Sequence, residues 1–278
     1  MQYDPIKRSL GRVFNTTPVL RKLFYKMLDL LLLRTWHVRK TLRHWVKSHP
    51  GELKVLDAGM GFGQYSYYMA SHYPKWRITG VDVKQEQVDD CNAFFKKVGL
   101  SNASFTFGDL EKFTHKNLYD LVISVDVMEH IPDDEAVFSN LAQALKPGGT
   151  LVVSTPSDQG GSDVHHHDED HVNDGSSSFI DEHVRDGYSI EDITAKLKRA
   201  GFDKIAVNYT YGTPGKLSWK LSMKYPILML NTTKLFFVIL PVWYLVTFPF
   251  ALLLNYMDLA GSHKTGTGLL VVATTAKR

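Results

Sequence analysis

The chain has 278 residues, of which 44% are hydrophobic and 22% charged, values ordinary for a globular protein that is long enough to bury a full core. Its single cysteine, Cys91, excludes an internal disulfide and fits a reducing compartment. The net charge is only +3, but residues 1–50 hold 11 Lys and Arg against 2 Asp, so we expect this region to meet an anionic surface. Residues 1–15 are polar and basic, and we expect no cleavable secretory signal there.

The first predicted helix starts near Thr17, which can cap it, and Pro18 suits the first helical position. Its leucines and other apolar residues share one side, which is the pattern of a basic amphipathic helix. The basic residues, on other sides, are Arg21, Lys22 and Lys26. Membrane contact and coverage of one end of a sheet both remain open for residues 5–33. We assign residues 1–49 to this basic N-terminal helical region.

Residues 55–63, Val-Leu-Asp-Ala-Gly-Met-Gly-Phe-Gly, are the most informative segment. They predict a buried strand that ends in the carboxylate of Asp57 and opens into a loop with a glycine at every second position. The three glycines are Gly59, Gly61 and Gly63. Glycine lets backbone N–H groups come close to a ligand, and the loop follows a first strand, where open α/β sheets bind ligands.

A second predicted strand, residues 78–83, carries Asp82 19 residues after the last glycine. This spacing suits a carboxylate that binds ribose hydroxyls, so the two strands together predict an adenosine-containing cofactor. Nicotinamide enzymes use G-x-G-x-x-G, whereas this loop reads G-x-G-x-G after Asp57. A carboxylate there suits an amino group and a sulfonium better than a pyrophosphate, which favours S-adenosylmethionine.

Three later segments carry matching signals. Residues 105–109 end in an acid, residues 119–126 form a strand followed by Met-Glu-His-Ile-Pro, and residues 145–154 form a helix end, a tight turn and a fifth strand. Together with the glycine loop they closely resemble the class I S-adenosylmethionine-dependent methyltransferases, over residues 50 to 210 and about the last ten. The branch most similar includes quinone-biosynthesis and other small-molecule and lipid methyltransferases.

This resemblance implies an α/β fold: a seven-stranded, Rossmann-like, doubly wound sheet of order 3-2-1-4-5-7-6, with six parallel strands and the last antiparallel. The cofactor-binding domain would be residues 50–212 plus 266–278. Asp57 and the glycines would meet the methionine part of S-adenosylmethionine, Asp82 the ribose and Asp109 the adenine, and S-adenosylhomocysteine would be the product. The full set of expected cofactor-binding residues is Asp57, Gly59, Gly61, Gly63, Asp82, Val83, Asp109, Ser124 and Asp126.

Candidate catalytic residues are His130, which follows the fourth strand, and His183 and Tyr188, on a segment that in related enzymes often folds over the substrate. Either histidine could serve as a general base, and His130 could instead only orient its loop. Arg185 could hold an anionic group on the acceptor. The histidine-rich run at residues 165–171 lies in a Gly- and Ser-rich loop, and we expect no metal site there.

An insertion at residues 213–265 separates the sixth and seventh strands, where this fold usually has a short connection. Within it, residues 235–254 contain no charged side chain and could form a helix of about 30 Å. A single membrane crossing is excluded if both flanking strands belong to one sheet. Because Pro241 and Pro249 would interrupt a straight helix, we expect one or two helices that lie in or dip into one leaflet, with a bend at Pro241.

These features predict a methyltransferase on the inner face of the cell membrane that acts on a hydrophobic small molecule: a quinone, phenolic or aryl polyene, isoprenoid or lipid. One alternative is a soluble enzyme whose insertion forms a homodimer interface or a substrate lid. A second alternative is a non-catalytic membrane-binding module. We expect an anionic membrane surface and no nucleic acid among the partners, because the N-terminal region has too many leucines for a solvated arm.

Overall fold

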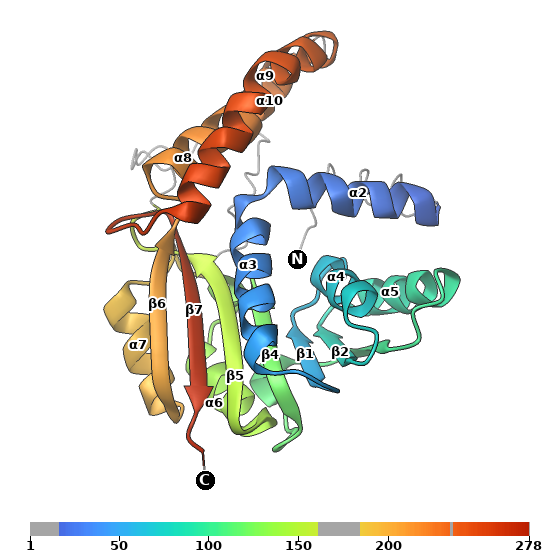
Figure 1. The fold of residues 1–278 in the computed structure, drawn as a ribbon, viewed down its shortest axis with the longest axis vertical. Helices are drawn as coiled ribbons and strands as arrows, with labels where there is room; N and C mark the ends of the chain where they lie inside the picture. The colour runs from blue at the N-terminus through green and yellow to red at the C-terminus, as the bar shows by residue number, and fades with distance from the viewer. Residues whose placement is uncertain (1–16, 161–183, 234–235, 278) are drawn as a thin grey trace.

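The computed structural model describes residues 17–160, 184–233 and 236–277. They form one seven-stranded sheet of order β3-β2-β1-β4-β5-β7-β6, in which β7 runs antiparallel to both of its neighbours (Figure 1). The predicted fold class, strand order and reversed last strand are therefore confirmed. The strands are β1 Lys54–Ala58, β2 Arg77–Asp82, β3 Ala103–Phe107, β4 Tyr119–Val125, β5 Leu145–Pro156, β6 Phe202–Thr210 and β7 Gly268–Thr275.

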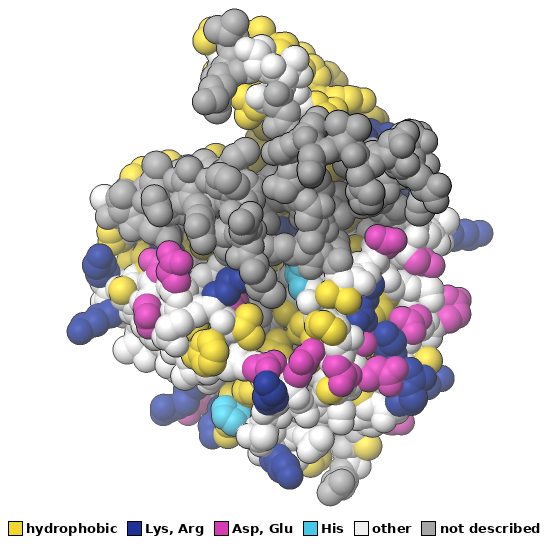
Figure 2. All heavy atoms as spheres, turned by 180° about the vertical axis from the view of Figure 1, so that it is seen from behind, with side chains coloured by type: hydrophobic (Ala, Val, Ile, Leu, Met, Phe, Trp, Pro, Cys, Tyr) yellow, Lys and Arg dark blue, Asp and Glu magenta, His cyan; other side chains and the backbone are white. Residues whose placement is uncertain are grey.

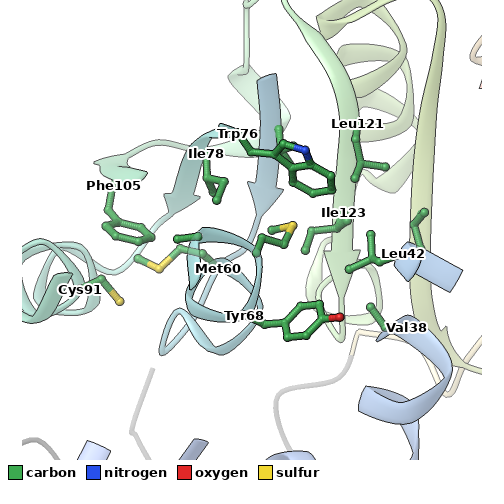
Figure 3. Close-up of a cluster of buried hydrophobic side chains, with 14 of the residues drawn as sticks. Val38, Leu42, Met60, Tyr68, Trp76, Ile78, Cys91, Phe105, Leu121 and Ile123 are labelled. Atoms are coloured by element: carbon green, nitrogen blue, oxygen red, sulfur yellow. The ribbon is translucent and has the colours of Figure 1, made fainter. Parts of the chain in front are cut away.

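Helices cover both faces of the sheet, and a separate buried cluster lies on each face. One cluster joins the sheet to α3 (Leu33–Ser48), α4 (Gln64–His72) and α5 (Gln85–Lys97), and the other joins it to α6 (Asp134–Ala144) and α7 (Ile190–Arg199). Figure 3 shows the first cluster, in which Leu42 of α3 lies beside Ile123 of β4 and Val38 of α3 lies beside Tyr68 of α4. Helix α3 of the N-terminal region thus covers part of one face of the sheet.

Helix α2 (Pro18–Leu31) begins as predicted, since Thr17 accepts a hydrogen bond from the Leu20 N–H and Pro18 is its first residue. Its orientation differs from the simple amphipathic reading, because Arg21 and Tyr25 face the domain. Arg21 is buried because it finds acceptors there: the Asp90 carboxylate at 2.5 Å, the Phe62 carbonyl at 2.9 Å and the sulfur of Cys91 at 3.2 Å. The exposed apolar side chains of α2 are Val19, Leu23, Met27 and Leu30.

The insertion forms a helical arm, residues 213–260, that projects beyond the carboxyl ends of the parallel strands (Figure 1). The outward path is α8 (Thr213–Trp219), a π-helical segment η3 (Lys220–Lys224) and α9 (Tyr225–Thr232), and α10 (Phe236–Ala260) returns. The two paths are joined by hydrogen bonds, including Trp243 Nε1 to the Leu221 carbonyl and Tyr244 to the Ser222 carbonyl, both at 2.9 Å.

Helix α10 runs unbroken through Pro241 and Pro249, so the predicted interruption is wrong. Each proline removes one backbone hydrogen bond from a helix of 25 residues, and packing against α8 and η3 holds the remainder. Because β6 pairs with β7, the arm leaves and returns at the same edge of the sheet. The two strands that flank the insertion therefore belong to one sheet, which is the condition under which a single membrane crossing was excluded from the sequence.

Asp258, fully buried near the end of α10, fixes the base of the arm. It pairs with His37 of α3 at 2.9 Å and with His263 at 3.3 Å, and it accepts hydrogen bonds from the backbone N–H groups of Tyr211 and Gly215. Burial alone would raise the pKa of this carboxyl, but the His37 and His263 contacts hold it below its usual value. A carboxyl with a lowered pKa stabilises the fold at neutral pH, and that contribution is lost as the pH falls through the lowered pKa.

We predict that Asp258→Ala lowers the free energy of unfolding by about 3–5 kcal/mol at neutral pH, because the histidines and backbone donors lose their acceptor inside the protein. Urea unfolding followed by circular dichroism measures this change. The control is Asp203→Ala, at an exposed position of β6, which should change stability little. Equal stabilities for the two variants would contradict the assignment.

Candidate functional site

The loop after β1 has the left-handed backbone that its glycines allow. Gly59 has φ of +79°, and a Cβ added there would lie 2.4 Å from a methyl group of Val127, so no other residue fits. Gly61 has φ of +50°, and a Cβ there would have nothing closer than 4.0 Å. The loop therefore presents backbone beside open space, as a ligand cradle requires.

Asp57, the predicted acid of β1, is 2% exposed, and its carboxylate accepts a hydrogen bond of 2.6 Å from Ser66 at the start of α4. Burial raises the pKa of Asp57 to about 7, although the Ser66 hydrogen bond opposes the shift. A positively charged ligand would strongly stabilise the ionised form of this buried carboxyl, because the described part of the protein provides no cation beside it.

Asp82 ends β2 as predicted and connects the two strands. Its carboxylate accepts hydrogen bonds from the Gly61 N–H at 3.0 Å and from the Lys84 N–H at 2.9 Å. It therefore lies directly against the glycine loop, where a carboxylate that binds the ribose hydroxyls is expected. Val83 is next along the chain and 51% exposed, which leaves it available to pack on a flat ring.

Asp109 lies beside a small pocket of about 190 Å³ at the end of β3, lined by Val81, Phe107 and residues 108–115 in part. One carboxylate oxygen of Asp109 caps a short helix by accepting from the Glu111 N–H at 3.0 Å, and the other is 3.2 Å from Lys112. Asp109 thus lies at the end of β3, where the sequence predicted contact with the adenine. Both of its carboxylate oxygens already make local contacts.

The end of β4 brings two further predicted residues to the same edge. Ser124 is fully buried, and its hydroxyl has no hydrogen-bond partner among the described residues. Asp126 has a left-handed backbone, with φ of +53°, and its carboxylate lies 2.6 Å from the guanidinium of Arg34 on α3. The predicted residues from β1, β2 and β4 therefore lie together at the carboxyl ends of neighbouring strands.

Of the predicted catalytic residues, His130 ends the short helix η2 (Met128–His130) just after β4 and is half-buried. His183 lies outside the described residues, as does the histidine-rich run at 165–171. Within the described ranges, no group of three or more His, Cys, Asp or Glu side chains could hold a metal ion.

Tyr188 is fully buried, and its hydroxyl donates to Asp134 at 2.7 Å and contacts the Met128 carbonyl at 3.1 Å. Burial and Asp134 raise its pKa well above the usual value. A general base must touch the acceptor, which does not fit a side chain with no exposed surface, so we assign Tyr188 a structural role. Arg185 is also engaged, by Asp134 and by the carbonyls of residues 131 and 132.

Glu129 and Arg34 lie at the same end of the sheet, and neither of them was given a role from the sequence alone. Glu129 is 1% exposed and accepts a hydrogen bond of 3.1 Å from Thr155 at the end of β5. Burial, and then the nearby Asp126, raise the pKa of Glu129 to about 8, so this carboxyl can hold a proton at neutral pH. Arg34 is separated from Asp126 by more than 90 positions, and no local pattern marks their contact.

A nearly parallel sheet with one reversed strand, and a left-handed glycine loop flanked by acids, define the nucleoside-binding fold of methyltransferases. Residues 49–201 match the family model described as "Methyltransferase domain", and the chain belongs to that family. It is a class I S-adenosylmethionine-dependent methyltransferase. The buried hydroxyl of Ser124, the cradle at Gly59 and Gly61 and the carboxylate of Asp82 fit this cofactor.

Among curated proteins, the chain is similar to ubiquinone biosynthesis O-methyltransferases. It is 29% identical to that of Rickettsia canadensis over 104 residues, 37% of this chain and 43% of the relative. It is 32% identical to that of Coxiella burnetii (strain Dugway 5J108-111) over 102 residues, 36% of this chain and 42% of the relative. The matched region thus spans less than half the length of these relatives.

Solved structures share the fold at lower identity. A phosphoethanolamine N-methyltransferase 2 of Haemonchus contortus, in complex with S-adenosylhomocysteine, aligns with TM-score 0.56 and 19% identity, over 86% of this chain and 52% of that chain. A putative sarcosine dimethylglycine methyltransferase of Galdieria sulphuraria aligns with TM-score 0.56 and 17% identity, over 87% and 84%.

We predict that the affinity for S-adenosylhomocysteine, which carries an ammonium group, rises about tenfold from pH 6 to pH 8 as Asp57, whose pKa is about 7, ionises. Calorimetry at both pH values measures it. In Asp57→Asn the rise in affinity with pH should be smaller, because residue 57 no longer titrates. Any pH dependence that remains in the variant would come from other groups, such as Glu129. An unchanged slope in the variant would contradict the role of Asp57.

Proposed function

We propose that this methyltransferase transfers a methyl group to a hydrophobic, membrane-resident small molecule, on a phenolic oxygen or ring carbon. The acceptor class is a quinone, phenolic or aryl polyene, isoprenoid or lipid. The names of the curated relatives, which are O-methyltransferases of ubiquinone biosynthesis, support an oxygen acceptor. The observation that carries the membrane part of the proposal is an apolar stripe on α10.

The α10 stripe is a row of exposed side chains at intervals of one to four residues, so it occupies one face of the helix. Its members are Val238, Ile239, Val242, Leu245, Val246, Phe250, Leu253, Tyr256 and Met257. The opposite face is buried, with Ala251, Asn255 and Asp258 each 3% exposed or less. Figure 2 shows hydrophobic side chains gathered on the arm and charged ones on the globular part. An apolar surface of this length must be covered by something.

Charge favours a membrane as the cover of the α10 stripe. The outward path of the arm carries Lys216, Lys220 and Lys224 together with Trp219 and Tyr225, the mixture of cations and aromatic rings typical of membrane interfaces. By length and composition alone, residues 238–260 also form one helix in the described chain that could cross a membrane. Since the arm returns to its own sheet edge, we place it in one leaflet, on the cytoplasmic side.

Helix α2 adds a second contact at the same edge. Its exposed Val19, Leu23 and Met27 alternate with Lys22 and Lys26, and its buried face holds the cofactor loop through the Phe62 carbonyl. A bilayer that touches both α2 and the arm would face the crevice, so an acceptor dissolved in it could enter without crossing water. Association with the membrane does not exclude a homodimer.

The acceptor's proton must leave when oxygen is methylated, and His130 is our proposed base, with His183 the other candidate. S-adenosylmethionine supplies an already activated methyl group, so the protein's task is alignment and proton removal. We predict that His130→Ala lowers kcat by about 10²–10⁴-fold at neutral pH and leaves the affinity for S-adenosylhomocysteine unchanged. The exposed His72→Ala is the control, and full turnover by the His130 variant would remove it from the mechanism.

Charge placed on the α10 stripe tests the membrane assignment. We predict that Val238→Glu with Leu245→Glu reduces binding to anionic vesicles by about tenfold or more, because carboxylates resist transfer into the apolar interface. Ser101→Glu with Gln143→Glu adds the same charge at exposed positions elsewhere and should bind as the unmodified protein does. Co-sedimentation measures binding, and methylation of phenolic lipids in the vesicles is read as a mass increase of one CH2 unit.

Two outcomes would contradict the proposal. A protein that stays in the supernatant with every vesicle, and elutes as a dimer that the stripe variant dissociates, would make the stripe a subunit interface. A protein that binds vesicles and does not bind S-adenosylhomocysteine would be a membrane-binding module without methyltransferase activity.

A further inference from the structure

Arg34 lies at the carboxyl edge of the sheet because the chain turns sharply between α2 and α3. Leu32 has an extended backbone, with φ of −94° and ψ of 106°, and α3 starts at the next residue. The Arg34 guanidinium then lies 2.6 Å from Asp126, and its backbone N–H donates to the hydroxyl of Tyr211 at 3.0 Å. A cation from the N-terminal region thus reaches the end of β4, beside the cofactor crevice.

Both partners of Arg34 have strained backbones. Asp126 and Tyr211 have φ of +53° and +54°, in the left-handed region that residues with a side chain seldom adopt. Strain of this kind persists only where surrounding contacts impose it, and it is concentrated at functional sites. The contacts of Asp126 are the ion pair with Arg34 and a hydrogen bond from its N–H to the Ser154 carbonyl. Tyr211 contacts the N–H of Arg34, and its own backbone bonds to Asp258 and to the Thr267 N–H.

The Arg34–Asp126 pair is accessible to a ligand. The two side chains are 36% and 30% exposed. Burial would lower the pKa of Arg34, but the Asp126 carboxylate more than offsets it, so the guanidinium keeps its charge. A guanidinium has five N–H donors, and its one ion pair within the described part of the chain is at Nη1. The remaining donors can bridge to a second anion.

The Arg34–Asp126 pair lies close to the glycine loop. Asp126 follows β4, which pairs with β1 at Asp57 and Ile123, so the guanidinium lies near the loop that binds the cofactor. Tyr65, two residues after the last loop glycine, lies on the same side, with its hydroxyl 3.3 Å from Thr35 of α3. Arg185, the cation that the sequence suggested for an anionic acceptor, is already engaged by Asp134 and two carbonyls.

We propose that Arg34 is a specificity-determining residue that binds an oxyanion of the acceptor, while Asp126 holds the guanidinium in place. The inference rests on the proposed function, since it names a group that the acceptor must carry. Two sources share this chemistry: the phenolate that becomes methylated, and a carboxylate on the same ring. Binding of the phenolate form by Arg34 would lower the pKa of the acceptor hydroxyl and so assist the base.

The experiment uses 4-nitrocatechol, whose absorbance distinguishes phenol from phenolate, with the full chain and S-adenosylhomocysteine. We expect the bound probe to ionise at a lower pH than the free probe. Arg34→Gln should weaken binding about tenfold or more and abolish this shift, because a charge-assisted hydrogen bond is lost. Arg34→Lys should restore part of both effects. The matched control is Arg43→Gln, on an exposed face of α3, which should behave as the unmodified protein does.

Benzoate, a carboxylate with no phenol, identifies the source of the anion. If benzoate competes with 4-nitrocatechol for the unmodified protein and this competition disappears in Arg34→Gln, the anion that Arg34 binds is a ring carboxylate. If benzoate does not compete, the anion is the phenolate. The proposal is overturned if Arg34→Gln binds 4-nitrocatechol unchanged or if the unmodified protein binds neither probe. It is also overturned if the variant loses S-adenosylhomocysteine binding, which would assign Arg34 to the carboxylate of the cofactor or to the fold instead of to the acceptor.

These outcomes are separable from those of the proposed function. Loss of vesicle binding or of lipid methylation, with the probe still bound through Arg34, would end the membrane acceptor and leave Arg34 as an anion-binding residue of a soluble acceptor. The reverse result, lipid methylation unaffected by Arg34→Gln, would end only the inference about Arg34.

Discussion

The pairing of β7 between β5 and β6 is the constraint on which the rest of the molecule depends. Because β7 runs antiparallel to β6, everything between them must leave and re-enter at one end of the sheet. That end is where parallel strands stop and where the glycine loop, Asp57, Asp82 and Asp126 lie. The long insertion therefore lies beside the cofactor loop, and it could not do so if β7 ran parallel to β6.

Much of the fold and of the cofactor site could be predicted because local sequence determines them. A left-handed loop needs glycine, so Gly59 and Gly61 mark its course, and an acid that follows a buried run marks the end of a strand. The cap at Thr17 is equally local. What these signals cannot give is the state of the side chain, such as the burial that shifts the pKa of Asp57 or the capping contact that engages Asp109.

The rest depends on contacts between distant segments. Arg34 meets Asp126, and Arg21 turns inward to the Phe62 carbonyl, only because the two N-terminal helices pack over the sheet edge. The helical periodicity predicted that Arg21 faces solvent with the other cations of the helix. A hydrophobicity pattern cannot show that buried hydrogen-bond acceptors lie where Arg21 reaches the domain. Tyr188 illustrates the same limit. Its position in the sequence suggested that it contacts the substrate, whereas in the structure its hydroxyl donates a hydrogen bond to Asp134.

The burial of Cys91 beneath α2 has a practical consequence. The thiol is fully buried, Arg21 donates to its sulfur, and burial raises its pKa to about 12, so the folded protein presents no reactive thiolate. Since this is the chain's one cysteine, a thiol-specific dye can label the protein only after the packing among α2, α5 and the glycine loop opens. The native sequence thus contains its own reporter, and the labelling rate measures how often this region opens, without an engineered probe.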